Sequence, residues 1–448
     1  YIMAGSSLTR TVSSTGNIYK GTLAMWFKRN AVDQEEYLFE NYETSGNRFF
    51  VRLLSTGQLG METLQGSSTV MQINTLNQFF DVGSWYHIVV GIDSTLATAA
   101  DRVKVYINGV QQTSYNDETQ PPQNQNMSIN EGNPTYVTIG RKYGASNYFD
   151  GYMASTIWID GTQYAASDFG AFDSTSGEWT PNGNPTVSYG TNGFKLTFED
   201  TSNLGDDTSG NTNDLATSGT PIPTPDCPSN NFPKYNNLIR QASINNLNLQ
   251  QGNLYSGGNG ANNWRSVFMT IAAKTGKYYC EMKCIGTDGS SQNYGVSDVN
   301  SFNTAPNDSF DFASQPRGYG LNPNGNKVNN GGAVSTGSTY TTNDIISMAL
   351  DLDNGKIYFA KNGTWYLSGD PTSGSTGTGS FFDITTGYFY SPTVAIYGAA
   401  DNMSFNFGNG YFRTTAVTSA GTPGTTTGIF EYDVPTGYQP WSTKGINV

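Results

Sequence analysis

Carboxylates at a defined spacing are the first chemistry to look for, because a retaining glycosidase needs its acid and its nucleophile about 5 Å apart. The spacing ExDxxE, which would set such carboxylates on one face of a strand, does not occur in this chain. Glu35 and Glu36 are adjacent and would point to opposite faces of a strand, and Glu281 stands alone among aromatic and thiol residues. The acidic residues therefore do not predict a glycoside hydrolase.

The single histidine, His87, lies in the segment GSWYHIV. A histidine-activated nucleophile needs a serine or cysteine and an orienting acid nearby, and the sequence marks neither. The motifs HExxH and GxSxG and the lysine of a phosphate-binding loop are also missing. We expect His87 to be a structural strand residue and the protein not to be an enzyme.

A turn-rich stretch near the end of the first half carries hard oxygen ligands of the kind that calcium prefers: Asp206, Asp207, Asn211 and Asp214. Calcium is the one metal that the sequence suggests. The same residue types also favour Asx-turns at a strand end, so a purely structural role stays open.

Aromatic residues near expected loop tips are the candidates for ligand binding: Tyr143, Tyr148, Trp179, Trp365 and Tyr366. A sugar ring has apolar C–H faces that stack on a flat aromatic side chain, while neighbouring Asn, Asp or Gly residues bond its hydroxyls. The alternative is that these rings only cap the ends of β-sandwiches.

Composition limits the partners. The 448 residues carry a formal net charge of −13, which would repel a phosphate backbone, so no nucleic-acid partner is expected. No apolar run approaches the ~18 residues of a membrane span, so no membrane insertion is expected. The three cysteines, Cys227, Cys280 and Cys284, are expected to be free thiols, because positions 280 and 284 of one strand lie too far apart for a disulfide.

The elements that must position these residues are strands. Segments such as TLAMWF (22–27), WYHIVV (85–90) and KYYCEMKCI (277–285) are dense in β-branched and aromatic residues, and no segment predicts an amphipathic helix. The stretch 346–365 predicts a hairpin with a two-residue type I′ turn at Asn354–Gly355. Residues 103–110 repeat the pattern, and 111–134 is expected to be a long surface loop.

These signals predict an all-β chain of two antiparallel β-sandwich, jelly-roll domains in tandem. Four prolines within eight residues, at 221, 223, 225 and 228, mark a stiff linker between them. The predicted parts are a first domain at 1–215, a Pro-rich linker at 216–239 and a second domain at 240–448.

The order of several motifs makes a family resemblance specific. The segments GSWYHIVVGID, DRVKVYINGV and DGYMASTIWIDGTQYAASDFG, with their neighbours across about residues 5–215, resemble the laminin-G-like, concanavalin-A-like modules of virion structural proteins in tailed phages. The segments TGKYYCEM, NYGVSD and ISMALDLDNGKIYFAKNGTW, within about residues 240–440, resemble the SPRY or B30.2 domain. The fold expected from these resemblances is concanavalin-A-like, then SPRY-like.

The resemblances imply a virion surface protein, a tail fibre or appendage or a capsid decoration, that exposes loops to a host-surface glycan or protein. Expected partners are other virion proteins of the capsid or tail, and a homo-oligomer is expected because such proteins are often symmetric. One alternative is a purely structural cement protein with no host ligand. Another is a polysaccharide-degrading glycoside hydrolase, since concanavalin-A-like folds include glucanases.

Overall fold

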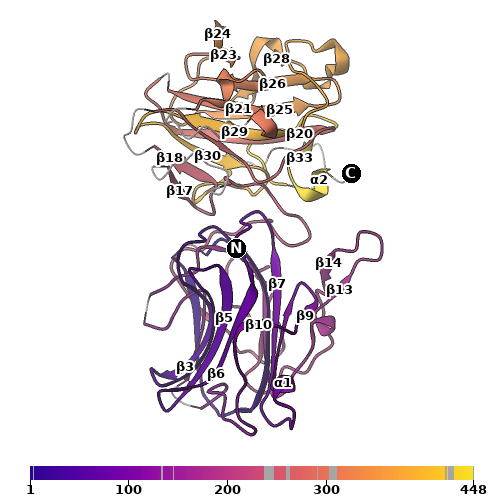
Figure 1. The fold of residues 1–448 in the computed structure, drawn as a ribbon. Helices are drawn as coiled ribbons and strands as arrows, with labels where there is room; N and C mark the ends of the chain where they lie inside the picture. Colours follow the sequence, from indigo (N-terminus) through magenta and orange to yellow (C-terminus); the bar gives the residue numbers. More distant parts are fainter. Residues whose placement is uncertain are drawn as a thin grey trace. The chain divides into compact units, whose positions relative to one another are not determined.

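A computed structural model describes residues 1–3, 5–132, 135–144, 146–236, 247–258, 263–289, 291–301, 310–418, 421 and 428–446. The chain divides into two compact units, Tyr1–Pro223 and Thr224–Val448 (Figure 1). Each unit contains two large antiparallel sheets, and the prediction of two β-sandwiches in tandem is confirmed. The two α-helices, α1 (Ala99–Arg102) and α2 (Thr443–Ile446), are single turns, and the described chain holds no helix with the length and apolarity to cross a membrane.

The first unit pairs an eight-stranded sheet with a six-stranded one. The eight-stranded sheet has the order β10 (Tyr115–Thr119), β6 (Ser68–Gln78), β5 (Gln58–Gln65), β4 (Asn47–Leu53), β3 (Glu36–Thr44), β11 (Thr135–Ile139), β1 (Ser7–Val12) and β16 (Ala216–Ser218). The six-stranded sheet has the order β15 (Phe194–Leu196), β12 (Gly151–Asp160), β2 (Lys20–Arg29), β7 (Tyr86–Asp93), β8 (Val103–Ile107) and β9 (Val110–Gln112). A separate hairpin joins β13 (Gly170–Phe172) to β14 (Trp179–Pro181), next to a 3₁₀ turn at Ala166–Asp168.

The core of the first unit lies between its two sheets. Period-two alternation places Phe39, Phe49 and Val51 on the inner face of the larger sheet, and Met25 and Trp158 on that of the smaller one. These five side chains are fully buried. The ring of Trp158 packs 4.9 Å from Phe39, and its indole N–H donates to Asn130 Oδ1 at 2.8 Å.

The second unit has a nine-stranded and a six-stranded sheet. The larger sheet follows the order β17 (Asn248–Gln250), β18 (Tyr255–Gly257), β30 (Asn402–Asn406), β20 (Lys277–Gly286), β25 (Ile345–Asp351), β26 (Lys356–Lys361) and β27 (Thr364–Trp365), with β28 (Phe382–Asp383) on β26 and β33 (Gln439–Pro440) parallel to β20. The smaller sheet is β19 (Arg265–Phe268), β29 (Tyr390–Ile396), β21 (Gln292–Asp298), β22 (Gly318–Leu321), β23 (Asn326–Asn329) and β24 (Gly332–Ser335). Minor elements are the pair β31 (Tyr411–Phe412) and β32 (Thr415–Ala416), and 3₁₀ turns at Val299–Ser301, Phe312–Ser314, Tyr366–Ser368 and Pro371–Thr376.

Aromatic side chains fill the second core. Tyr294 packs edge-on against Phe359 and Phe405, with ring centres 5.7 and 5.4 Å apart. Ile357 is fully buried and Phe359 is 1% exposed, so the prediction that both are packing residues is confirmed. Cys280 lies in the same interior, with its sulfur 3.2 Å from the Tyr294 hydroxyl, and all three cysteines are free thiols.

The turn predicted for the hairpin at 346–365 is wrong. Strands β25 and β26 pair Asp351 with Lys356, so four residues, not two, connect them. Gly355 has a φ of +65°, whereas Asn354 is not in the left-handed region. The Asp351 carboxylate instead accepts the backbone N–H and the side-chain amide of Asn354, at 2.9 and 2.8 Å, and so stabilises the longer loop.

Two other sequence predictions also need correction or placement. The expected surface loop 111–134 contains the edge strand β10. Its sequence is too polar to predict a strand, and the strand forms by pairing with β6. In the predicted linker 216–239, residues 216–218 form β16, and Tyr235 is fully buried against Phe405 of the second unit. The two units divide at Pro223–Thr224, inside this segment, while residues 237–239 and the expected start of the second domain at 240 lie outside the described residues.

Candidate binding sites

The outer face of the eight-stranded sheet carries a row of tyrosines, the tyrosine strip: Tyr42, Tyr136 and Tyr143. Tyr42 and Tyr136 are cross-strand partners on β3 and β11. The ring of Tyr143 stacks on both, at 4.2 Å from Tyr42 and 4.6 Å from Tyr136, with interplanar angles of 19° and 25°. All three are partly exposed.

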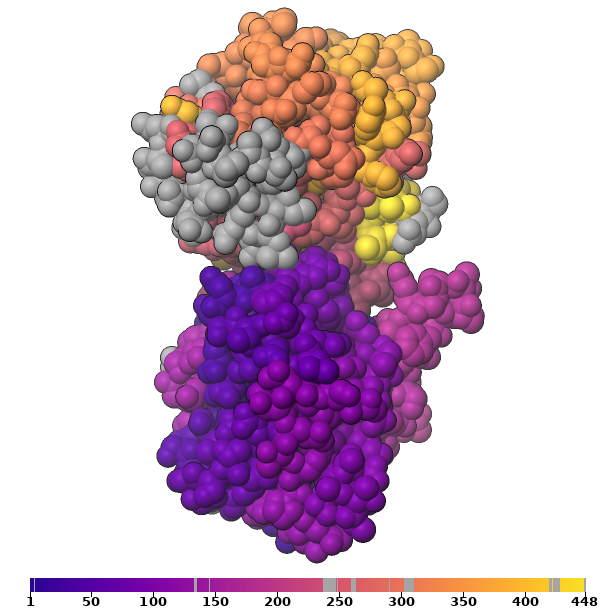
Figure 2. All heavy atoms as spheres, viewed as in Figure 1, coloured from indigo at the N-terminus to yellow at the C-terminus, as the bar shows by residue number. Residues whose placement is uncertain are grey.

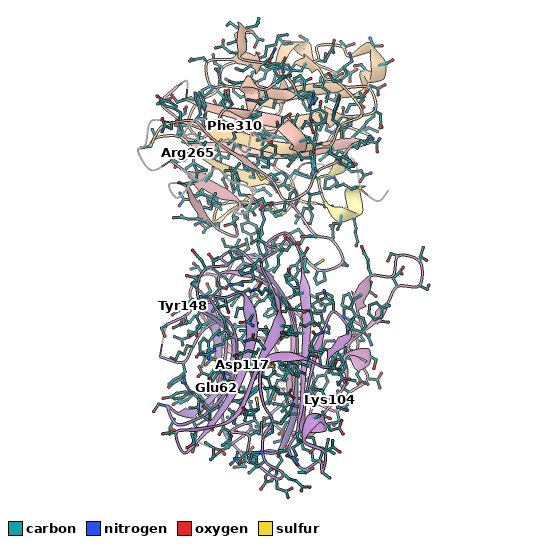
Figure 3. The ribbon with its side chains drawn as sticks, viewed as in Figure 1. Glu62, Lys104, Asp117, Tyr148, Arg265 and Phe310 are labelled. Atoms are coloured by element: carbon teal, nitrogen blue, oxygen red, sulfur yellow. The ribbon has the colours of Figure 1, made fainter. Side chains whose placement is uncertain are left out.

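The buried carboxylate of Glu40 ties Tyr143 to the sheet. Its Oε2 accepts the backbone N–H of Tyr143 at 2.6 Å, and burial raises the pKa of Glu40. Tyr148, labelled in Figure 3, lies in the same loop, with the Arg141 guanidinium 6.0 Å from its ring centre. The structure thus places Tyr143 and Tyr148 in one region of the first unit.

Carboxylates on the same sheet face are paired with arginines. Arg52 forms ion pairs with Glu35 at 3.0 Å and with Glu62 at 3.2 Å, and Arg48 pairs with Glu40 at 3.4 Å. Both guanidinium groups also lie 4.9 Å from the ring centre of Phe50. Every one of these three carboxylates is therefore held by a cation.

Glu36 pairs with a different arginine from its neighbour Glu35. It forms a fully buried ion pair with Arg29 at 3.1 Å, and burial raises its pKa to about 7. Because its second oxygen accepts the backbone N–H of Asp150 at 2.9 Å, Glu36 anchors the end of the 141–150 loop.

Trp179 belongs to the hairpin β13–β14, which stands out from the surface of the first unit (Figure 2). Its ring turns back onto Gly109, and its indole N–H donates to His87 Nδ1 at 3.0 Å. His87 also stacks on Trp26 at 4.7 Å and is 3% exposed. Burial lowers the pKa of His87 to about 3, so the imidazole is neutral and accepts a hydrogen bond. Trp179, predicted to bind ligand, thus uses its polar atom inside the protein.

Three of the four predicted calcium ligands, Asp207, Asn211 and Asp214, bond to groups of the protein with their side chains. Both carboxylate oxygens of Asp207 accept backbone N–H groups, from Lys195 and Ser209 at one oxygen and from Asn213 at the other. Asp214 accepts the N–H of Asp207 at 3.0 Å, and Asn211 directs its amide N–H groups to two backbone carbonyls. No trio of acidic, His or Cys side chains in the described ranges is placed to hold a metal. The calcium site at Asp206, Asp207, Asn211 and Asp214 stays a prediction that this geometry does not support.

Trp365 lines a pocket of about 270 Å³ in the second unit. The lining residues come from the larger sheet and from the chain that crosses its outer face: Tyr279, Ser347, Ala360, Gly363, Trp365, Tyr432 and Asp433. Tyr366 does not join them, because its ring packs 6.3 Å from Phe381 and its hydroxyl donates to the carbonyl of Thr339 at 2.8 Å. The two adjacent aromatics therefore have different roles.

Beneath this pocket lies the fully buried carboxylate of Glu281. It accepts four hydrogen bonds, from the Tyr279 hydroxyl at 3.1 Å, from Asn406 Nδ2 at 3.1 Å, and from the backbone N–H groups of Glu431 and Tyr432 at 2.9 Å each. Burial raises its pKa to about 7, against the lowering effect of these donors. Glu281 fixes the segment that carries Tyr432 and Asp433 to the sheet.

Sequence reasoning missed Tyr432, Asp433 and Ser347 as pocket residues. They are more than 60 positions from Trp365 or on a different strand, and no local pattern connects them. The one available signal was Glu281 itself, an acid amid the apolar alternation of KYYCEMKCI, since a buried carboxylate requires donors from elsewhere in the fold.

Residues 5–162 match the family model described as the Concanavalin A-like lectin/glucanases superfamily. The predicted concanavalin-A-like resemblance of the first domain is thereby confirmed over those residues. No curated protein matches the chain in sequence.

Solved structures that match parts of the chain include two SPRY domains and a pentraxin. The SPRY domain of human HERC1 is 17% identical, covering 38% of this chain and 96% of its own, with a TM-score of 0.30. The TRIM65 PSpry domain is 14% identical, with coverages of 39% and 89% and a TM-score of 0.28. The heptameric SAP-like pentraxin from Limulus polyphemus is 17% identical, with coverages of 35% and 71% and a TM-score of 0.26.

Proposed function

We propose that this chain is a non-enzymatic surface protein of a tailed-phage particle, a tail fibre or appendage or a capsid decoration, whose first unit binds a glycan of the host surface. The observation that carries the proposal is the contrast on one sheet face. Its carboxylates, Glu35, Glu40 and Glu62, are all paired with arginines, while the tyrosine strip beside them stays partly exposed.

That contrast favours binding over hydrolysis. A glycosidase needs one carboxyl to protonate the leaving oxygen and a second within about 5 Å as the nucleophile, or farther away as a base that activates water. Each of these three carboxylates is engaged by an arginine guanidinium and is not free to contact a leaving oxygen or a water molecule. Tyrosine edges and hydroxyls, in contrast, suit the alternating apolar and hydroxyl surfaces of a sugar.

Placement on a phage particle is supported by the ordered motifs across residues 5–215 that resemble virion modules. Partners on the particle would be capsid or tail proteins. A homo-oligomer would raise the avidity of a weak sugar site by presenting several copies at once.

Glycan arrays with the purified chain test the proposal. We expect binding to bacterial surface glycans, a loss of about tenfold in affinity for Tyr143→Ala, and no change for Tyr388→Ala, an aromatic of the second unit that is 37% exposed.

Release of reducing sugars from a polysaccharide panel would contradict the non-enzymatic role. Blank arrays, together with binding to purified capsids or tails, would favour a structural cement protein. Labelling the protein in intact particles by electron microscopy distinguishes a fibre from a decoration.

A further inference from the structure

The pocket beside Trp365 has walls that the local backbone holds in place. The turn Asn362–Gly363 has φ values of +49° and +81° and connects Lys361 to Thr364 in a two-residue hairpin. The ring of Tyr432 lies on Gly363, so closely that a Cβ there would stand 2.8 Å from Tyr432 Cδ1. Trp365 follows two residues later and contributes a second aromatic wall.

The floor of the pocket is a hydrogen-bonded network. The Tyr279 hydroxyl lies 2.8 Å from Ser347 Oγ and 3.1 Å from Glu281 Oε1. The carboxylate beneath the floor is bonded to hydroxyl, amide and backbone donors, all of them neutral. None of these donors is a basic side chain.

Carboxylates lie close to the same aromatic walls. Asp433 is the one charged residue among those that line the described pocket. Asp344 bonds neutral donors, the Asn362 amide at 2.7 Å and the Thr341 N–H at 2.9 Å, and Glu431 accepts the N–H of Thr418 at 2.7 Å. Burial, followed by the charges of Glu431, Glu281 and Asp344, raises the pKa of Tyr432.

A desolvated cation is attracted both by aromatic walls and by nearby carboxylates, because the face of an aromatic ring and a carboxylate each have a negative electrostatic potential. Trp365 also lies on β27, the last strand in the order of its sheet, where an extended peptide can pair with a strand edge. A pocket of about 270 Å³ has room for one long side chain.

We propose that this pocket of the second unit binds a cationic side chain, a lysine ammonium or an arginine guanidinium, presented by a partner protein. The site is separate from the tyrosine strip and does not depend on the glycan-binding proposal.

The full chain is titrated with a blocked pentapeptide that has a central lysine in four alanines, and with the same peptide carrying norleucine, followed by saturation-transfer NMR. We expect the lysine peptide to bind at least about tenfold more tightly than the norleucine peptide, and more weakly as salt is added. Trp365→Ala should lower the affinity about tenfold, and Asp433→Asn several-fold. The matched control is Tyr388→Ala, which removes an exposed ring of the same unit that lies 4.3 Å from the Arg317 guanidinium.

Several results would overturn the proposal. Equal affinity for both peptides would show that the pocket does not recognise the positive charge. Equal affinity of the wild type and Trp365→Ala for the lysine peptide would show that the peptide binds at another place. Saturation by D-glucose and D-glucosamine alike, with no response to the lysine peptide, would make it a sugar pocket. If Trp365→Ala fails to fold by circular dichroism, Asp433→Asn decides, and an unchanged affinity in that variant counts against the proposal.

Discussion

Two Asn-Gly turns, one in each unit, have the same construction and different consequences. In the first unit, Asn108 exchanges two hydrogen bonds with His87: its N–H donates to the His87 carbonyl, and its side-chain oxygen accepts the His87 N–H, both at 2.8 Å. In the second unit, Asn362 makes the same pair of bonds with Ile345, at 2.8 and 2.9 Å. An aromatic ring then covers the glycine of each turn, Trp179 on Gly109 and Tyr432 on Gly363.

The difference arises from the side chain next to each ring. His87 accepts a hydrogen bond from the Trp179 indole N–H, and its ring stacks between those of Trp179 and Trp26. The first turn is therefore covered by three stacked aromatic rings. Tyr432 is held from below by Glu281 through its backbone N–H, which leaves its ring as the wall of a pocket. One local motif thus supports filled packing in one unit and a binding pocket in the other.

The largest expected effect on stability distinguishes the Asn108–Gly109 turn, which Trp179 covers, from the Asn362–Gly363 turn, which Tyr432 covers. Gly109→Ala would place a Cβ 2.2 Å from Trp179 Cε3 at a φ of +80°, and we expect it to lower the free energy of unfolding by about 3 kcal/mol. Gly363→Ala should cost about 1–2 kcal/mol, because the Tyr432 ring can move toward the pocket. The control is Gly66→Ala, which has a φ of +57° and nothing within 4 Å, with a cost of about 1 kcal/mol from backbone strain alone. Urea unfolding followed by tryptophan fluorescence measures all three, and equal costs would mean that ring packing does not distinguish the turns.

The next effect is the pH dependence of the stability that the stack of Trp26, His87 and Trp179 contributes. The folded-state pKa of His87, about 3, lies below its ordinary value of 6.5, so its contribution to stability is complete above pH 6.5 and is lost as the pH falls toward 3. Between pH 7 and pH 4 the wild type should lose about 3 kcal/mol relative to His87→Gln, whose amide oxygen can still accept the Trp179 N–H. Parallel pH profiles of the two proteins would show that His87 titrates normally in the folded state.

A smaller effect of opposite sign is expected beneath the pocket. The folded-state pKa of Glu281, about 7, lies above its ordinary value of 4.5, so the stability it contributes is present below pH 4.5 and is lost as the pH rises to 7. The unfolding free energy of the wild type minus that of Glu281→Gln should fall by about 2.5 kcal/mol over that range, because the folded protein ionises this carboxyl less readily than the unfolded chain does. A difference that rises with pH would contradict a raised pKa and point to a carboxylate stabilised in its charged form.

Several features could be predicted from the sequence because they depend on neighbouring residues. The density of β-branched and aromatic residues in TLAMWF and KYYCEMKCI predicted β2 and β20, and the Asn-Gly pair at 108–109 predicted a tight turn that has φ values of +46° and +80°. The Asn354–Gly355 pair failed the same rule. There the cross-strand register of β25 and β26 placed Asp351 opposite Lys356, and a carboxylate cap stabilised a four-residue loop.

The candidate sites depended on longer-range packing. Tyr143 and Tyr148 were predicted as exposed aromatics, but nothing local showed that Tyr143 stacks on Tyr42 and Tyr136 from two strands. Trp179 carried the same signal and became a packing residue, because the protein supplied an acceptor for its indole N–H.

The sequence by itself determined an all-β chain of two sandwiches, since alternation and turn chemistry act over a few residues. Only the tertiary structure decided which aromatic rings close the core and which border a pocket. Trp179 meets its acceptor 92 residues away, and Tyr432 meets Glu281 across 151 residues. Contacts over such separations are set by how the sheets and the crossing segments pack together, which no local pattern of residue types encodes.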